Sequence, residues 1–329
     1  MTDDDNNPHN KNPPYWVSHS HPGPRRPDVA YGDFDETLSN QWMFHCVADT
    51  ILANTLMRSF ASQVDPNRIG LTGISWGGVI TSTVAGLDSR FSLVIPIYGC
   101  GDLGCANSYL GKGIQGHVEF YNKVWDACLY LPQATMPSLW ISWPDDPHFP
   151  MINLKHSYEA MGSTRYAMVS LIPGLQHGHA VGWSRPESYT FAKYVWNRNS
   201  KRGWCHQISG DVVHHVGNTM AQVKFISALP FQRAELVSTN DDDNVQAGER
   251  TWQYSSCVLK SSATPSLWAA EAFLPQDTAS WVINLYTGHD TTDGLVVTST
   301  YQDLNLFAYA VMVDAMQVPE QPKAKGWFW

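Results

Sequence analysis

A serine between two glycines is the feature of this sequence best suited to do chemistry. It stands in Gly73-Ile74-Ser75-Trp76-Gly77. The apolar run Ile69–Gly73 leads into this motif, and the helix-compatible residues 76–87 follow the serine. This setting predicts a tight strand-to-helix turn that exposes the serine hydroxyl as a nucleophile. Glycines at both flanks would let the backbone segments approach closely, and the Trp76 N–H would face a developing oxyanion. The alternative is a buried serine in an ordinary turn.

A serine hydroxyl is a weak nucleophile unless a base removes its proton, and the base needs an orienting acid. The apolar run Ser138–Trp143 is followed by Pro144, Asp145 and Asp146. A residue just past the carboxyl end of a strand lies at the same edge of a parallel sheet as the serine turn. We therefore predict Asp146 as the acid, with Asp145 as its alternate. The non-catalytic alternative is a loop turn between prolines.

Two histidines follow the next apolar run, Ala167–Ile172. His177 stands where the general base is expected, because the order serine, acid, histidine is the order of this type of site. His179 is the alternate base. Two histidines at this spacing could also bind a metal, but no cysteine or carboxylate accompanies them locally, so we expect no metal. Attack by an activated serine requires no cofactor either.

These residues require a sheet that brings strand ends together. Four apolar runs without clean alternation predict strands buried on both faces; they are Ile69–Gly73, Leu93–Tyr98, Ser138–Trp143 and Ala167–Ile172. Helical segments are predicted around them, over 40–63, 76–87, 151–161 and 188–198. Such alternation indicates an α/β fold with a parallel sheet covered by helices. The first helix carries an apolar stripe that includes Phe44, Leu52 and Leu56, and Ser39 or Asn40 would cap it.

After about residue 205 the pattern changes to short runs that alternate apolar and polar residues. Seven candidate strands predict a small antiparallel β-sandwich; they are Val212–Val216, Ala221–Ser227, Ala234–Val237, Thr251–Tyr254, Ser266–Phe273, Ala279–Tyr286 and Leu295–Tyr301. Asp241-Asp242-Asp243 lies between two of them, and we interpret it as a solvated hairpin tip rather than a cation site. The predicted organisation is a flexible segment 1–39, an α/β layer 40–205, a β-sandwich 206–316 and a tail 317–329.

Composition excludes several classes of protein. With 43% hydrophobic and only 16% charged residues, the chain can bury a large core and is not globally disordered. A net charge of −9 argues against nonspecific nucleic-acid binding. No apolar run reaches the roughly 18 residues of a membrane-spanning helix. The first residues show no secretory signal, so a cytoplasmic location is the default expectation. The six cysteines do not form a disulfide scaffold, and the state of Cys100 and Cys105 stays open.

The stretch Arg68–Gly78 resembles the nucleophile region of α/β-hydrolases close to acetylxylan esterase and prolyl oligopeptidase. Four later segments are similar to the corresponding parts of those enzymes: Gly86–Phe91, Pro96–Gly101, Asp146–Pro150 and Gln176–His179. The resemblance covers about residues 40–200. It implies a serine hydrolase with Ser75 as nucleophile, Asp146 as acid and His177 as base. The C-terminal part is similar to the accessory β domains of some of these enzymes.

One departure from that family pattern concerns the N-terminal strands. Several strands normally precede the serine turn, but the residues before the helix at 40–63 are polar and rich in proline. The run Ile69–Thr72 would then become an exposed sheet edge, and the loop that carries the family's second oxyanion donor would be missing. Ser18–Pro24 could offer a substitute N–H. We expect either an incomplete N-terminus or a shortened, weakly active relative.

The sequence thus predicts hydrolysis of a carboxylic ester through an acyl-enzyme. The expected substrate is a small ester or an acylated saccharide. The alternatives are a peptidase of the prolyl-oligopeptidase type and an inactive binding protein that uses the hydrolase fold as a scaffold. Four aromatic residues between the second and third strands are expected to cover the substrate pocket: Tyr109, Phe120, Tyr121 and Trp125. Oligomeric state is undetermined.

Overall fold

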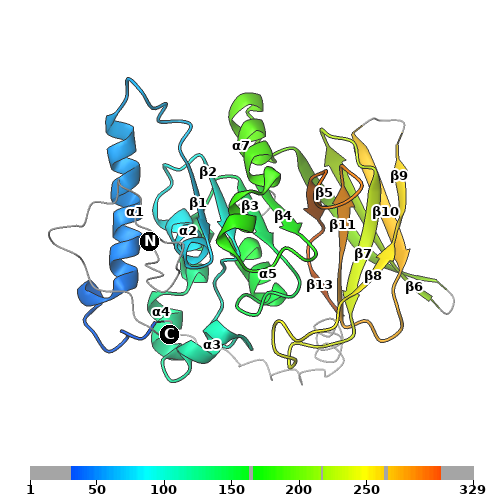
Figure 1. Ribbon diagram of the computed structural model, residues 1–329, viewed down its shortest axis with the longest axis horizontal. Coiled ribbons are helices and arrows are strands. Elements are labelled where there is room, and N and C mark those ends of the chain that lie inside the picture. Colours follow the sequence, from blue (N-terminus) through cyan, green and yellow to red (C-terminus); the bar gives the residue numbers. More distant parts are fainter. Residues whose placement is uncertain (1–30, 163–165, 216–217, 263–265, 305–329) are drawn as a thin grey trace, which may run out of the picture.

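Four parallel strands form the part of the sheet that carries the predicted site residues. They are β1 (Gly70–Ile74), β2 (Leu93–Ile97), β3 (Ser138–Ser142) and β4 (Ala167–Leu171), and they lie in this order (Figure 1). Every residue of β2 and β3 is buried. The predicted parallel sheet is therefore confirmed, and burial on both faces holds for β2 and β3 but was wrong for β1, which has no buried residue.

The computed structural model describes residues 31–162, 166–215, 218–262 and 266–304. Three predicted features lie outside these ranges. They are most of the flexible segment 1–39, the tail 317–329 and the Ser18–Pro24 stretch.

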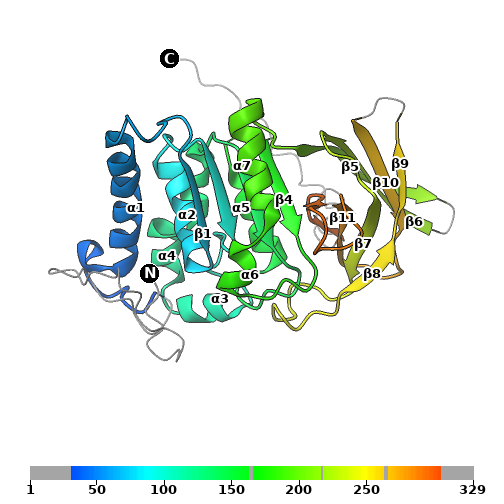
Figure 2. The ribbon, with the colours of Figure 1, turned by 45° about the horizontal axis from the view of Figure 1, so that its top comes forward.

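Helices alternate with these strands as predicted. The longer ones are α1 (Trp42–Ser59), α2 (Trp76–Leu87), α5 (Met151–Ala160) and α7 (Pro186–Arg198). Shorter ones are α3 (Tyr109–Ile114), α4 (Val118–Val124) and α6 (His179–Trp183), with 3-10 turns η1 (Leu38–Asn40), η2 (Ala127–Leu129) and η3 (Leu131–Gln133). Helix α2 packs on β1 and β2, α1 packs on α2, and α7 contacts β2 (Figure 2). In the described part of the chain, no helix is both long and apolar enough to cross a membrane.

The details predicted for the first helix were wrong. Its N-cap is Gln41 rather than Ser39 or Asn40, and the Trp42 amide donates instead to the Asp33 carboxylate at 2.6 Å. The apolar stripe does not face the core as a whole, because Leu52 and Leu56 are about 60% exposed. The buried residues of α1 are Met43, Val47 and Asn54. A polar residue takes a core position there because it has a buried partner, described below.

The C-terminal part forms two sheets. Five of its strands join the parallel sheet beyond β4: β7 (Arg233–Thr239), β8 (Gln253–Ser256), β11 (Ser280–Tyr286), β12 (Val296–Thr298) and β13 (Gln302–Asp303). The other four form an antiparallel sheet: β5 (Cys205–His215), β6 (Asn218–Ser227), β9 (Val258–Ser261) and β10 (Leu267–Phe273). The predicted fold class, a parallel α/β sheet with a small antiparallel β part, is confirmed. Strands β9 and β13 were not predicted.

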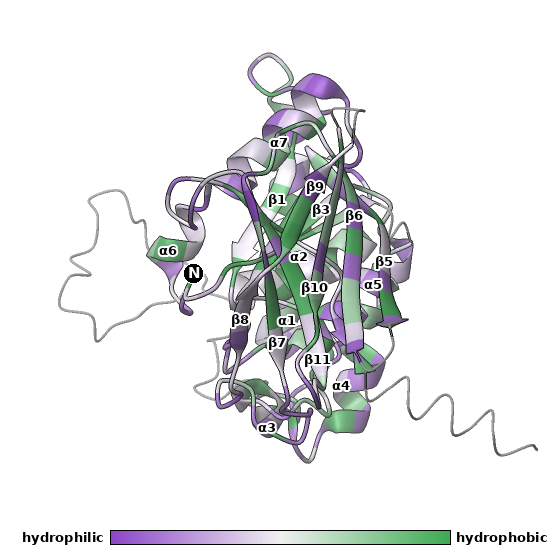
Figure 3. Cartoon of the chain, turned by 90° about the vertical axis from the view of Figure 1, so that its right-hand side faces the viewer, coloured by the Kyte–Doolittle hydropathy of each residue, from purple (hydrophilic) through white to green (hydrophobic). Residues whose placement is uncertain are grey.

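The antiparallel sheet buries one face. Along β6, buried and more exposed residues alternate, and Figure 3 shows the matching alternation of hydrophobic and hydrophilic bands. Ala221, Val223 and Phe225 are buried, and Trp268 of β10 packs against Phe231 with ring centroids 5.5 Å apart. Because strands from before and after residue 205 share one nine-stranded sheet, the division of the chain at that residue stays a prediction.

Strand β1 forms one end of the large sheet. Over the described ranges its one strand neighbour is β2, which matches the predicted sheet edge. None of its residues is fully buried.

All six cysteines are free thiols, including the buried Cys100 and the exposed Cys105.

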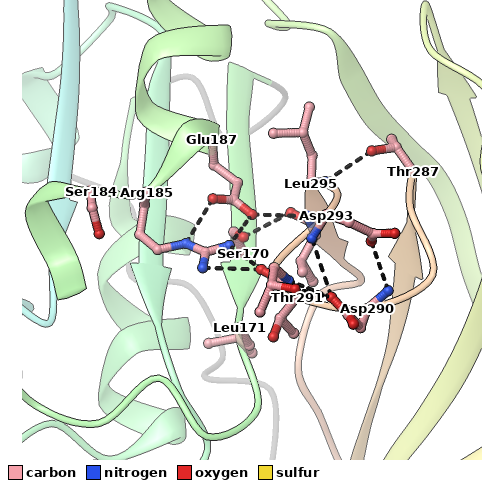
Figure 4. Close-up of polar contacts among 12 residues, drawn as sticks. Ser170, Leu171, Ser184, Arg185, Glu187, Thr287, Asp290, Thr291, Asp293 and Leu295 are labelled. Carbon is pink, nitrogen blue, oxygen red and sulfur yellow. Dashed lines mark hydrogen bonds and ion pairs between the residues drawn. The ribbon is translucent and has the colours of Figure 1, made fainter.

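A buried ion pair ties α7 to the C-terminal strands. The Arg185 guanidinium donates to both oxygens of Glu187, at 2.9 and 2.7 Å, and also to the Thr291 carbonyl (Figure 4). Glu187 is fully buried and accepts a further hydrogen bond from the Val296 amide of β12 at 3.0 Å. Ser170 of β4 donates to the Val296 carbonyl at 2.7 Å. The pair therefore links the helix to β12, and Ser170 in turn links β12 to β4.

A second buried carboxylate holds α1 against the end of α2. Asp88, at the end of α2, accepts hydrogen bonds from Asn54 of α1 at 2.9 Å and from Arg90 through two nitrogens at 2.7 Å. Burial alone would raise the pKa of Asp88. The bonds from Arg90 and Asn54 outweigh this and hold its pKa below the usual value. This pairing explains why Asn54 is buried on α1.

Asp88→Asn should destabilise the fold by about 1–3 kcal/mol at pH 7, because Arg90 and Asn54 lose their charged partner. The folded-state pKa of Asp88 lies below its unfolded value, so its stabilisation is present above that unfolded value of about 3.9. The stabilisation declines as the pH falls through the folded-state pKa. Urea unfolding should show a deficit at pH 7 that shrinks in acid. Asp65→Asn, at a half-exposed pair with Arg68, is the control, and an equal deficit there would contradict the assignment.

Glu187→Gln should cost about 3–5 kcal/mol, because it leaves the nearly buried Arg185 guanidinium without a counter-charge. Glu119→Gln removes a matched ion pair with Lys123 that is mostly exposed and should cost under about 1 kcal/mol. Guanidinium-chloride unfolding of both variants measures the difference. Similar midpoints for the two variants would show that the buried pair does not contribute as expected.

Candidate active site

Ser75 occupies the tight turn between β1 and α2. Its backbone has φ 58° and ψ −116°, a conformation that a residue with a Cβ rarely adopts. A Cβ on Gly73 would lie 2.1 Å from the Gly77 carbonyl oxygen, so position 73 requires glycine. A Cβ on Gly77 would meet open space. The steric reason predicted for both glycines therefore holds for Gly73 and was wrong for Gly77.

Close backbone packing holds this turn at the end of the sheet. The Ser75 amide donates to the Ile97 carbonyl at 2.9 Å, and the Val79 amide donates to the Ser75 carbonyl at 3.0 Å. A Cβ on Gly99 would lie 2.1 Å from the carbonyl carbon of Gly78. The first turn of α2 thus lies directly against the chain that leaves β2, with no side chain between them.

The structure brings Ser75, His177 and Asp146 into one hydrogen-bonded chain. Ser75 Oγ lies 2.9 Å from His177 Nε2, and His177 Nδ1 lies 2.9 Å from Asp146 Oδ2. An ionised carboxylate only accepts, so Nδ1 carries the proton and Nε2 is left to accept from the serine hydroxyl. In this tautomer the imidazole can take the serine proton.

Asp146 is 1% exposed, and its carboxyl group accepts several hydrogen bonds. Besides His177, it accepts hydrogen bonds from the Trp143 indole at 3.2 Å and from the amides of His148 at 2.9 Å and Phe149 at 3.1 Å. A buried carboxyl group needs such partners to offset the loss of water. Two of the donors are backbone amides, so the loop itself fixes the orientation of the acid.

Three rings surround the imidazole of His177. The centroids of Tyr98 and His148 lie 4.8 and 4.7 Å from it, and Phe149 is nearly parallel to it at 6.0 Å. The Tyr98 hydroxyl donates to the Gln176 carbonyl at 2.9 Å, and burial raises the pKa of Tyr98 well above its usual value. Burial, together with the nearby His177, lowers the pKa of His148. His148 is therefore mainly neutral at pH 7.

The alternate acid and base, Asp145 and His179, lie apart from the hydrogen-bonded chain of Ser75, His177 and Asp146. Asp145 is partly exposed and its pKa is raised by burial. His179 is exposed at the first position of α6. In the described ranges no hydrogen bond or ion pair connects either residue to Ser75 or His177. The described residues also contain no cluster of side chains suited to a metal ion.

The Trp76 amide is the first of α2, where amides have no acceptor within the helix. The Trp76 ring packs edge-on against Tyr31 at 4.8 Å and Trp42 at 5.7 Å. These ring contacts fix the position of Trp76 directly after Ser75, and the oxyanion role of its amide stays a prediction. The Ser18–Pro24 stretch, expected to offer a second donor, lies outside the described residues.

The predicted aromatic cover of the pocket was wrong for two of its four residues. Tyr121 is fully buried, and Trp125, 5% exposed, donates from its indole to Gln41. Tyr109 does lie beside the site, because its exposed ring stands 5.4 Å from the His148 ring. The sequence reasoning did not identify Tyr98 or His148 as neighbours of the histidine. A signal was present for His148, which lies two residues after the predicted acid.

Comparison with known proteins gives one family match and several structural likenesses. Residues 31–117 match the sequence profile of the prolyl oligopeptidase family. No curated relative matches the chain. Acetyl xylan esterase 1 from Thermoanaerobacterium sp. JW/SL YS485 is 18% identical over 50% of this chain and 56% of its own, with a TM-score of 0.42.

Two peptidases of known structure are similar to this chain to about the same degree. A puromycin-hydrolyzing peptidase of Mycobacterium tuberculosis is 18% identical over 46% of this chain and 25% of its own, with a TM-score of 0.41. The Pyrococcus horikoshii acylaminoacyl peptidase is 22% identical over 44% of this chain and 26% of its own, with a TM-score of 0.36. The chain thus spans between a quarter and just over half of these proteins. The resemblance to α/β-hydrolases of the prolyl-oligopeptidase kind is confirmed by the family match, which covers the segment that contains Ser75.

Proposed function

We propose that this protein is a serine hydrolase that cleaves a carboxylic ester through an acyl-enzyme intermediate. Ser75 acts as nucleophile, His177 as general base and Asp146 as the orienting acid. The observation that carries this proposal is the hydrogen-bonded chain of two 2.9 Å contacts through His177. Its three members stand at or just past the carboxyl ends of three parallel strands.

In the proposed reaction, Ser75 Oγ attacks the ester carbonyl carbon while His177 Nε2 takes the serine proton. Asp146 accepts from Nδ1–H and stabilises the imidazolium that forms. The carbonyl oxygen becomes an oxyanion beside the Trp76 amide. When the tetrahedral intermediate collapses, the bond to the leaving oxygen breaks and His177 returns the proton to it. Water, activated by the same imidazole, then attacks the acyl group and regenerates Ser75.

An ester is proposed as the substrate because an ester is cleaved more easily than an amide. The Trp76 amide, at the start of α2, is the proposed oxyanion donor. One such donor is worth about 2.7–4 kcal/mol, or 10²–10³ in turnover. The exposed Tyr109 ring could stack on a sugar ring or an acyl chain, so an acylated saccharide is one candidate substrate.

A peptidase is the second candidate function. The observation that favours it is the match of residues 31–117 to a family named for its peptidase members. The same nucleophile and base would serve both reactions, and only the substrate pocket would differ.

Ser75→Ala should abolish labelling of the purified protein by a fluorophosphonate probe, because the probe reacts with an activated serine. Ser59→Ala, an exposed serine on α1 that bonds to the Leu56 carbonyl, should label like the wild type. Asp146→Asn should lower kcat by about 10⁴, because the imidazole then loses the tautomer that accepts the serine proton. An unlabelled but well-folded wild-type protein would instead support the inactive binding protein.

Esterase and peptidase activity can be separated with two chromogenic substrates. We expect turnover of p-nitrophenyl acetate and little or no release of p-nitroaniline from a peptidyl anilide. Ser75→Ala is the blank for both reactions. A higher kcat/KM for the anilide would reverse the preference and favour the peptidase.

A further inference from the structure

The connection between β7 and β8, residues 240–252, contacts the loop that carries Asp146. Gly248, in this connection, has φ +84°, and its backbone lies against Pro147. A Cβ at Gly248 would stand 2.9 Å from Pro147 Cβ, 3.1 Å from Pro147 Cα and 3.5 Å from the Asp145 carbonyl oxygen. A segment about 100 residues later in the chain therefore contacts the residues on both sides of Asp146.

The same connection is bonded to the segment that precedes α3. The Ala247 amide donates to the Asn107 carbonyl at 2.9 Å, and the Asn107 side chain donates to the Asn244 carbonyl at 2.8 Å. The Tyr109 amide in turn donates to the Pro147 carbonyl at 3.1 Å. Three chain segments thus hold one another, and Pro147 lies where they meet.

Hydrogen bonds within the connection hold its charged side chains in place. The Arg250 side chain is 5% exposed and donates to Asp243 at 2.5 Å. Asp241 accepts from the Thr251 amide at 2.6 Å, and Asp242 accepts from the Asn244 amide at 2.8 Å. All three aspartates therefore have partners within the turn, in line with a hairpin tip rather than a cation site.

We infer that residues 240–252 are a positioning element of the active site that holds the Asp146 loop against His177. The inference rests on the proposed function for its catalytic meaning. Two of the four donors to Asp146 are the amides of His148 and Phe149, which directly follow Pro147. A displacement of Pro147 would move both amides and rotate the carboxyl group. The hydrogen bond between Asp146 and His177 Nδ1 would then lengthen.

The consequence is that the C-terminal part supports the site and is more than an appended domain. Gly248 and Arg250 act through other residues and do not touch the proposed reacting atoms. They are therefore positioning residues, and their loss should affect the acid–imidazole hydrogen bond before it affects substrate binding. This effect should appear as a lower kcat with KM nearly unchanged.

Gly248→Ala and Gly116→Ala form a matched pair for the test. Both glycines have positive φ, +84° and +90°, but a Cβ at Gly116 meets nothing within 4 Å. Backbone strain is therefore common to the two variants, and contact with Pro147 is specific to Gly248→Ala. In ¹H NMR of the full-length protein, the low-field signal of His177 Nδ1–H should shift or disappear in Gly248→Ala and stay in place in Gly116→Ala. With p-nitrophenyl acetate, kcat should fall at least about tenfold in Gly248→Ala alone.

Arg250→Lys is the second variant, in case Gly248→Ala does not fold. It keeps the charge but loses the planar group that donates to both Asp243 and the Val245 carbonyl, so the same signal should shift by a smaller amount. If both variants keep the wild-type signal and kcat, the inference is overturned. If the wild-type protein shows the NMR signal but neither turns over esters nor labels with the probe, the proposed function fails while the positioning role is still tested by the signal.

Discussion

The buried carboxyl group of Asp146 is the constraint on which the rest of the site depends. A carboxyl group removed from water is costly unless donors replace the water. Here the donors come from the strand end at Trp143, from the loop at His148 and Phe149, and from His177. Because three of these donors belong to the acid loop and the fourth to the histidine loop, satisfying this one group sets the two loops in a single relative position.

The C-terminal strands contact both ends of the loop that carries His177. Leu171, the last residue of β4, donates from its amide to the Thr298 hydroxyl at 2.7 Å and accepts from the Asn284 side chain at 3.0 Å. The histidine loop begins directly after this residue. At the other end of this loop, Arg185 forms the ion pair with Glu187. The histidine loop is thus held at both ends by contacts that involve strands from beyond residue 205.

Local patterns in the sequence were sufficient to predict the elements that carry the proposed chemistry. The Gly-x-Ser-x-Gly turn, the two aspartates after Ser142 and the histidines after Leu171 all follow directly from strand ends. Uninterrupted apolar runs located each of the four parallel strands within one residue. Apolar periodicity failed on α1, because that helix has apolar residues on more than one side, and the pattern does not show which side a neighbour will cover. The burial of Asn54 depends on Asp88, which is 34 residues away.

By itself, the sequence determined the α/β class, the positions of four strands in the chain and the residue types that follow their ends, because these depend on short-range patterning. Only the tertiary structure decided that Asp146 rather than Asp145 reaches His177, and that five later strands extend the same sheet. It also decided that the turn containing Gly248 lies against Pro147. The physical reason is that such contacts join residues far apart in the chain, and their partners are selected by packing and hydrogen-bond satisfaction in three dimensions.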